Sequence, residues 1–205
     1  MVLAFDGMRE DDFDMKKFEL WKNGKTGYPL VDACMRALKE EGWLNFRMRA
    51  MVVSFASYNL WLDWKKTSKV LAGYFTDYEP GIHYNQIQMQ SGVTGINTIR
   101  IYNPTKQLMD HDPRGRFVRK WCPELKDVPD DFLAQPHMLP AAAQKKYNCI
   151  VGEDYPSISV DLLQSSKFAR DKIYTIKSLP NTRIQSLAAY ELHGSRNKNS
   201  NKYRS

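Results

Sequence analysis

The stretch PLVDACMRALKEEG, residues 29–42, decides the fold class. Its apolar side chains Leu30, Cys34 and Leu38 recur at helical spacing, with charged residues between them. A proline opens the stretch and a glycine closes it, the order in which these residues flank α-helices. The stretch therefore predicts an amphipathic helix that buries one face against a core.

Residues 46–64 carry the next helical pattern. Apolar side chains follow an i, i+4, i+7, i+11 spacing with few charges between them, which predicts one helix buried on most sides. After it, Thr67 or Ser68 is expected to cap a short helix that runs to residue 75. The apolar set of the longer helix is Met51, Phe55, Tyr58 and Leu62.

Residues 77–103 show no sustained periodicity of either kind, and prolines, glycines and amides are frequent in them. They predict a long irregular segment, which in a compact domain is more often functional than idle. Further short helices are expected between Pro113 and Pro123 and from Pro140 to Tyr147. Near the end, helix faces are expected in two sets: Ala169, Ile173 and Ile176, then Ile184, Leu187 and Ala188.

No alternating strand pattern and no internal repeat is visible, so the predicted fold is all-α with long irregular loops. A length of 205 residues is sufficient for one sizeable core. We expect an N-terminal lead-in over residues 1–17, one domain over 18–192, and a basic flexible tail over 193–205.

The formal charge of +7 is compatible with a polyanionic partner such as DNA. An alternative is that the charge is merely solvated, because much of the excess lies in a Gly/Ser/Asn-rich end. Charge alone does not choose between these two readings. The basic residues of that end are Arg196, Lys198, Lys202 and Arg204.

The three cysteines, Cys34, Cys122 and Cys149, are odd in number and lack CxxC spacing. This pattern indicates neither a disulfide framework nor a metal site, and it favours a reducing compartment. The acidic beginning is unlike a signal peptide, and no apolar run has the length of a membrane span. We expect a soluble protein without a membrane partner, in the cytoplasm or another intracellular compartment that contains DNA.

Several stretches in order resemble the FAD-binding domain of the DNA photolyase and cryptochrome family. The resemblance covers roughly residues 18–175, and agreement of several ordered motifs is far less expected by chance than agreement of one. The stretches are WKNGKTGYPLVDACMRAL (21–38), GWLNFRMR (42–49), DYEPGIHYNQIQMQSG (77–92), RIYNPTKQ (100–107), DPRGRFVRKWCPEL (112–125) and GEDYPSISVD (152–161).

The resemblance implies a helical domain that holds FAD, with DNA carrying ultraviolet lesions as its partner. In the family's repair enzymes, light excites the reduced flavin, which passes an electron to a pyrimidine dimer and receives it back after the bond splits. The lesion is first flipped out of the duplex. The implied activity is that of a deoxyribodipyrimidine photo-lyase, or of an incomplete part of one.

Five residues match positions beside the flavin. Arg49 matches an arginine next to the ring and Asp77 its carboxylate partner, although a purely structural ion pair is the alternative. Tyr78 and Glu79 complete an Asp-x-Asp-like stretch, with Glu in place of the second Asp. His83 matches the position that faces the flavin N5, where photolyases typically carry Asn. Without the resemblance, the acidic residues and the histidine would be read as solvated loop residues.

Four residues match positions that contact DNA or the lesion. Arg47 and Gln107 match residues that meet the strand near its phosphates, which positions DNA rather than reads its sequence. Phe46 stands where CPD photolyases typically have Asn, and Met89 where they have a stacking Trp. For Phe46 and Met89, filling of the core is the alternative. The two replacements leave the usual lesion recognition open.

The family's electron path runs through three tryptophans, of which Trp64 matches the middle one. Ile87 and Asp11 stand at the proximal and distal positions, and neither side chain relays an electron as Trp does. Photoreduction by this route is therefore expected to be poor. Aromatics that could form another path, or simply fill the core, are Tyr58, Trp61, Tyr74, Tyr78 and Tyr84.

The family's phosphate-binding Thr/Ser-rich segment, its lesion-contacting helix with a Glu and a Trp, and its antenna domain are not found in this sequence. We therefore expect the C-terminal portion of a photolyase, with a partner chain supplying the missing part of the FAD domain. Two other hypotheses stay open. One is a cryptochrome-like blue-light photoreceptor module, and the other is a non-catalytic remnant that binds nucleic acid.

Overall fold

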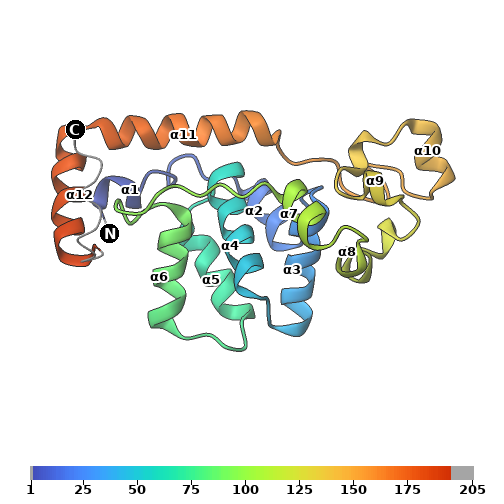
Figure 1. Ribbon diagram of the computed structural model, residues 1–205, viewed down its shortest axis with the longest axis horizontal. Coiled ribbons are helices and arrows are strands. Elements are labelled where there is room, and N and C mark those ends of the chain that lie inside the picture. Colours follow the sequence, from blue (N-terminus) through green and yellow to red (C-terminus); the bar gives the residue numbers. More distant parts are fainter. Residues whose placement is uncertain (1, 195–205) are drawn as a thin grey trace.

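The computed structural model describes residues 2–194 and contains α-helices, three short η-helices and connecting loops (Figure 1). Over this range the backbone forms no strand, only an isolated bridge between Val151 and Tyr155. The predicted all-α fold is confirmed. The helices are α1 (Leu3–Asp6), α2 (Met15–Lys22), α3 (Pro29–Glu41), α4 (Phe46–Ser54), η1 (Phe55–Asn59), α5 (Trp64–Tyr74), α6 (Pro80–Ser91), α7 (Pro104–His111), α8 (Arg116–Trp121), η2 (Pro123–Leu125), α9 (Asp130–Leu133), η3 (Pro136–Met138), α10 (Ala141–Lys146), α11 (Leu162–Ser178) and α12 (Pro180–His193).

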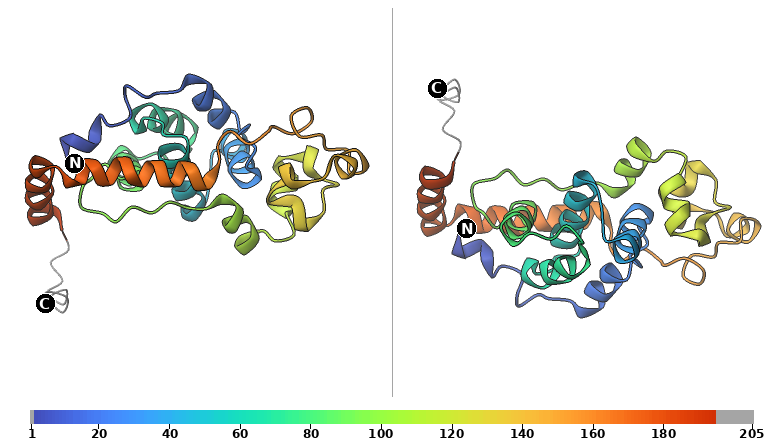
Figure 2. Two further views of the ribbon diagram at one scale, coloured as in Figure 1. Left: turned by 90° about the horizontal axis from the view of Figure 1, so that it is seen from above. Right: turned by 90° about the horizontal axis from the view of Figure 1, so that it is seen from below.

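Helices α2 to α6 form the central bundle, and the long α11 lies across it (Figures 1 and 2). The small helices α8 to α10 form one end of the molecule, and α12 forms the other. Asn59 in η1 donates from Nδ2 to the hydroxyls of Ser165 and Ser166 at 3.0 and 3.1 Å, which ties α11 to the bundle. No helix among residues 2–194 is both long enough and apolar enough to cross a bilayer.

The helix predicted from residue 29 is confirmed as α3, but the predicted solvated face is wrong, because residues 29–35 are all buried and only residues 39–41 are exposed. Its apolar face, with Leu30, Cys34 and Leu38, is fully buried in the core. Gly42 ends it at φ 71°, and its N–H donates to the carbonyl of Leu38. A left-handed φ of this kind is readily adopted only by glycine, so the residue fixes where the helix stops.

The single helix predicted over residues 46–64 is wrong. The chain turns through α4 and the π-helical η1, and then breaks before α5 with Trp61 at φ 56°. Asp63 begins α5, because its side chain accepts from the N–H of Lys65. The apolar spacing continues through the break because the residues on both sides of it are buried.

Thr67 and Ser68, predicted as caps, are also placed wrongly. Both lie inside α5 and are buried there. Their hydroxyls donate to carbonyls of the preceding turn, Thr67 to Trp64 and Ser68 to Lys65. Such back-bonding satisfies a hydroxyl within a helix, so a Ser or Thr does not by itself mark a helix start.

The irregular segment predicted over residues 77–103 contains the twelve-residue helix α6. Pro80 is its first residue, Glu79 caps it, and Gly92 ends it at φ 76°. Helical periodicity is weak here because one face of α6 packs on the bundle while another lines a cavity through polar side chains. Residues 93–103 lack regular structure, as predicted.

The later helices follow the predictions closely. Helices α8 and α10 lie where the prolines indicate, and Ala169 and Ile173 bury one face of α11. The predicted face of α12 exists, but Ile184 and Leu187 on it are exposed. The predicted basic tail lies, from residue 195 onward, outside the described residues.

Candidate functional site

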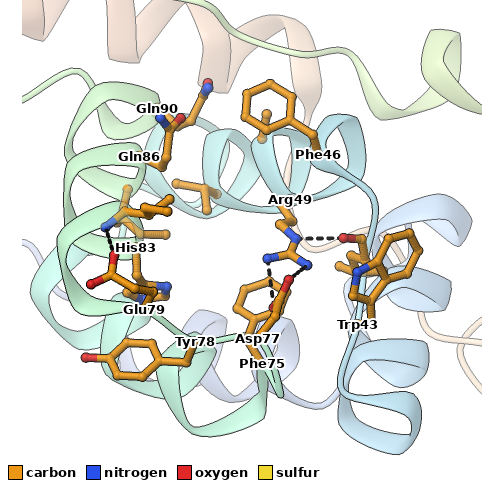
Figure 3. A pocket seen from close by; sticks show the side chains of 15 residues that line it. Trp43, Phe46, Arg49, Phe75, Asp77, Tyr78, Glu79, His83, Gln86 and Gln90 are labelled. Atoms are coloured by element: carbon orange, nitrogen blue, oxygen red, sulfur yellow. Dashed lines mark hydrogen bonds and ion pairs between the residues drawn. The ribbon is translucent and has the colours of Figure 1, made fainter.

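A cavity of about 380 Å³ opens between α4, α6 and the loop that joins α5 to α6 (Figure 3). This volume is at the low end of the range of small-molecule sites, roughly 300–1,000 Å³. Its walls are mostly apolar, with a small number of polar groups. Six of the predicted site residues line it, from three segments of the chain: Phe46, Arg49, Asp77, Tyr78, Glu79 and His83.

Arg49 projects from α4 and is held on several sides. Its Nη1 and Nη2 donate to the two carboxylate oxygens of Asp77 at 3.0 and 2.8 Å, and its Nε donates to the carbonyl of Leu44 at 2.6 Å. The guanidinium carbon lies 4.2 Å from the centre of the Phe75 ring. The hydrogen bonds from Arg49 lower the pKa of the Asp77 carboxyl, so both partners are charged near neutral pH. The pair puts a fixed cation at the cavity.

His83 projects from α6 and is buried beside the cavity. Its Nε2 lies 3.0 Å from the carbonyl oxygen of Ser68. A carbonyl only accepts, so Nε2 carries the proton and Nδ1 is the acceptor of the neutral ring. Burial lowers the pKa of His83 below its usual 6.5, which keeps the ring neutral at pH 7. The cavity therefore has a neutral imidazole beside a guanidinium.

Aromatic rings surround His83 and fix its plane. The ring centres of Tyr78 and Tyr84 each lie 5.2 Å from that of His83, and the ring of Phe75 lies 6.2 Å away. All three pairs meet edge to face, the arrangement that aromatic quadrupoles favour. Tyr78 is exposed at the rim of the cavity. The histidine is thus held in place by packing as well as by its hydrogen bond.

Glu79 has a role that its position in the sequence did not reveal. Its Oε2 accepts from the backbone N–H of Ile82 at 2.6 Å, which makes it the N-cap of α6. The same side chain lines the cavity. Glu79 therefore both starts the helix that carries His83 and adds a negative charge to the edge of the site.

Gln86 and Gln90 are site residues that the sequence analysis missed. Both project from α6 into the cavity wall, on the same side as His83 (Figure 3). Gln86 Oε1 is buried and accepts no hydrogen bond from any residue in the range 2–194. The available signal was their spacing of three and seven residues from His83, which puts all three on one face if the segment is helical.

Of the four residues predicted to contact DNA, the structure places only Phe46 at the cavity. Phe46 lies at the mouth of the cavity with 64% of its surface exposed. Arg47 is exposed on the next position of α4 but does not line the cavity. Met89 and Gln107 are partly buried, and neither lines the cavity.

Trp64, the predicted middle member of an electron path, is the first residue of α5 and is buried. Its Nε1 donates to Asp6 at 3.0 Å, and its side chain does not line the cavity. Ile87 does line the cavity, whereas Asp11 is exposed. Among residues 2–194 no group of three or more His, Cys, Asp or Glu side chains could hold a metal ion.

These features define a class of protein: a helical domain whose cavity suits a planar ring with polar edges. The apolar walls fit the faces of such a ring, and the unpartnered Gln86 Oε1 fits an N–H on its edge. The isoalloxazine ring of FAD has both properties, and the guanidinium of Arg49 suits its electron-rich edge. The residues present therefore fit a flavin.

Comparison with known proteins agrees with this class. Residues 3–175 match the family model described as the FAD binding domain of DNA photolyase. The chain is 38% identical over 161 residues to a cryptochrome DASH from Synechocystis sp., covering 78% of this chain and 33% of that protein. It is 34% identical over 168 residues to a deoxyribodipyrimidine photo-lyase from Alkalihalophilus pseudofirmus, covering 80% and 35%. A crystal structure of a class III photolyase from Agrobacterium tumefaciens superposes with a TM-score of 0.76 at 30% identity, covering 85% and 37%.

The chain belongs to the photolyase and cryptochrome family, through its FAD-binding domain. It spans about a third of the length of the curated relatives it matches. The predicted family and FAD, the cofactor of the matched domain, are confirmed.

Proposed function

We propose that this chain holds the isoalloxazine ring of FAD in the cavity between α4 and α6 and takes part in light-driven repair of pyrimidine dimers in DNA. The observation that carries the proposal is the joint placement of Arg49, Asp77 and His83 around that cavity. When bound, FAD would supply the absorption of light and the electron that splits the dimer.

Arg49 would bind and orient the ring. Its bidentate pair with Asp77 and its contact with Phe75 fix the guanidinium before any ligand enters, so little ordering is needed on binding. The guanidinium attracts a negatively charged ring by Coulomb attraction, and the carboxylates of Asp77 and Glu79 at the same cavity oppose that attraction. Arg49 would favour the reduced, anionic state of the cofactor through direct contact with the ring.

His83 would act as an acceptor toward the ring. Its Nε2–H is engaged by Ser68, which leaves the Nδ1 lone pair for an N–H of the ligand. The asparagine that photolyases typically have at this position can present either an oxygen or an amide group. As long as its imidazole stays neutral, His83 can only accept a hydrogen bond from the flavin at this position.

DNA would approach at the open mouth of the cavity. Phe46 and Tyr78 are exposed there, and Arg47 projects from the same turn of α4 as Phe46. Exposed aromatic rings can stack on an extruded base, and a nearby arginine can pair with phosphate. Gln107 and Met89 lie outside this opening, so we give them at most a supporting role.

A partner chain that supplies further FAD contacts stays part of the proposal. It would contribute contacts to the phosphates of FAD, with this chain acting as the C-terminal part of the domain. The exposed apolar rim of the cavity, which includes Trp43 and Ile82, is a surface that such a chain could cover. An intracellular, DNA-containing compartment is the setting that this function requires.

A second candidate is a cryptochrome-like photoreceptor module. His83, Phe46 and Met89 replace the residues typical of CPD photolyases, and Ile87 lines the cavity where the proximal tryptophan of the electron path is expected. These replacements affect repair more than flavin binding. The relatives carry both kinds of name, cryptochrome and photo-lyase.

The first experiment is titration of the purified chain with FAD, followed by absorption in the near ultraviolet and blue. We expect a structured flavin spectrum, and at least a tenfold loss of affinity in Arg49→Ala, roughly the 1.4 kcal/mol of one charged hydrogen bond. Arg47→Ala is the matched control, because Arg47 lies on the same helix outside the cavity. An equal loss in both variants would exclude the proposed position of the ring.

The second experiment separates the two candidate functions. Flavin-loaded protein is mixed with DNA that carries cyclobutane dimers or (6-4) photoproducts, and lesion loss is followed in light and in darkness. Light-dependent repair that is weakened by Arg47→Ala, with a smaller dependence on salt, supports the repair function. Light-induced spectral change without lesion loss supports the photoreceptor.

A further inference from the structure

Helix α12 lies outside the part of the chain that the family accounts for. The family match ends at residue 175, and α12 begins at Pro180. The helix stands at one end of the molecule, across the end of α11, in all three views (Figures 1 and 2). Neither the cavity nor the proposed DNA approach uses it.

One face of α12 anchors it, and the opposite face packs on no other segment within residues 2–194. Thr182 is buried and Ala189 packs on the core. On the outer face, Ile184, Leu187 and Tyr190 are 66%, 64% and 50% exposed. Three large apolar side chains on one short helix are an exposed patch of the kind that marks an interaction site.

The outer face has an internal symmetry in charge and shape. At about 100° per residue, Arg183 and Glu191 lie about 40° to either side of Leu187 on the helix surface, one turn before it and one turn after it. Ile184 and Tyr190 lie about 60° to either side, each three residues away. Leu187 is thus the centre of a patch whose two halves are complementary, positive against negative and aliphatic against aromatic.

We infer that this face binds a second copy of the chain, with the two α12 helices antiparallel about a two-fold axis at Leu187. In that arrangement, residues equally distant from Leu187 on its two sides face each other across the axis. Arg183 then faces the Glu191 of the other copy, twice, and Ile184 faces Tyr190, twice. Leu187 packs against its own copy.

Charge selects this arrangement over its alternatives. In a parallel pair, Arg183 would face Arg183 and Glu191 would face Glu191, which is repulsive at both ends. The last residues of the chain, 195–205, contain Tyr203 but no aliphatic side chain, so their composition does not suit an apolar patch. The observations therefore favour a second copy over the chain's own end.

The interface is small, and the association should be correspondingly weak. A single pair of helices of 14 residues buries less than the roughly 1,200 Å² typical of stable complexes. We expect a monomer at low concentration and a dimer at high concentration. Because surface ion pairs are screened, added salt should shift the equilibrium toward monomer.

The test is sedimentation velocity of the full chain over a range of concentrations, with charge-reversal variants. The average mass of the unmodified chain should rise from 23.8 kDa toward twice that value. Because of the two-fold axis, Arg183→Glu or Glu191→Arg alone reverses both ion pairs, and each should raise the concentration needed for dimers about tenfold. The double variant R183E/E191R should return it to within about threefold of the original, since both pairs are restored with opposite sense.

Cross-linking tests the position of the axis independently. Leu187→Cys puts two thiols on the axis and should form a disulfide-linked dimer under mild oxidation. Leu163→Cys, 80% exposed on α11, is the matched control. The native cysteines, all buried, should give little background. A monomeric mass at every concentration, no rescue in the double variant, or equal cross-linking of both cysteine variants would each overturn the inference.

Discussion

Individual residues at the cavity serve the fold and the proposed chemistry together. The pair of Arg49 and Asp77 joins α4 to the loop before α6, and it also puts a cation where the flavin ring is proposed to bind. Because Asp77 is half-exposed, solvent screens the pair and its contribution to stability is small. The orientation of the guanidinium is therefore its main effect.

His83 leads to a prediction about pH. Burial lowers its folded-state pKa below 6.5, so the unfolded chain takes up a proton first as the pH falls through about 6.5. The stability that the neutral histidine contributes is thus present above pH 6.5 and is lost below it. In chemical unfolding, the wild-type chain should lose more stability than His83→Asn between pH 7.5 and pH 5.5.

The comparison with His83→Asn isolates this residue. His137 also has a lowered pKa, but it is present in both proteins and its effect cancels. An equal loss of stability in both proteins would mean that His83 is solvated in the folded chain. Its proposed role as a neutral acceptor would then have no basis.

At the scale of elements, α6 carries the histidine and both glutamines of the site and depends on its two ends. Glu79 begins it by accepting from the N–H of Ile82, and Gly92 ends it. Between them, His83, Gln86 and Gln90 are directed at the cavity by helical spacing alone. A change at Gly92 should therefore disturb the site from outside the cavity, whereas a change at Glu79 also alters the cavity wall.

Glu79→Ala should lower the free energy of unfolding by about 1 kcal/mol, the usual effect of losing an N-cap. Glu40→Ala is a suitable control, since Glu40 is exposed near the end of α3 and makes no side-chain hydrogen bond within residues 2–194. Urea denaturation of the two variants measures the difference. Equal stabilities would show that the cap contributes nothing to the stability of the folded chain.

Gly92→Ala should destabilise by more than 1 kcal/mol. Its φ of 76° is strained for any side chain, and a Cβ there would lie 2.5 Å from the buried hydroxyl oxygen of Tyr58. Gly73→Ala is the opposite case, because it lies inside α5 with open space around its Cβ, and should stabilise by about 0.5–1 kcal/mol. Thermal unfolding of both variants should show shifts of opposite sign.

At the scale of the whole molecule, hydrogen bonds between distant segments join the later part of the chain to the central bundle. The hydroxyl of Tyr155 donates to Asp32 inside α3 at 2.6 Å, across 123 residues of sequence. The carboxylate of Asp32 also accepts from the backbone N–H groups of Thr26 and Gly27. Burial raises the pKa of Asp32, and these hydrogen bonds oppose that rise. The later part of the chain is thus fastened to the first long helix.

Tyr155→Phe should destabilise the protein by about 1–3 kcal/mol, because one oxygen of a buried carboxylate loses a donor. Tyr147→Phe, whose hydroxyl makes no hydrogen bond within residues 2–194, should change stability by less than about 0.5 kcal/mol. Denaturant unfolding followed by circular dichroism checks both. Similar values for the two variants would mean that Asp32 finds another donor.

Patterns in the sequence were sufficient for elements whose two ends carry strong local signals. Helix α3 begins at a proline and ends at a glycine, and these residues placed it correctly although nearly all of its sides are buried. The family motifs in turn led to FAD, and to six residues that the structure places around one cavity. The sequence is sufficient in both cases because the residues that flank a helix and the residues of a family motif lie close together along the chain.

Tertiary structure alone decided the break between α4 and α5, the helix α6 and the partners of each cavity residue. The break lies in a fully buried stretch, where hydrophobic spacing continues although the backbone turns at Trp61. Helix α6 has polar residues on its cavity face, so its pattern does not resemble that of a helix on a core. The proton on His83 is fixed by the carbonyl of Ser68, 15 residues away. The break, the helix and the tautomer each depend on contacts between groups that are distant in the sequence. The order of residue types along the chain does not specify those contacts.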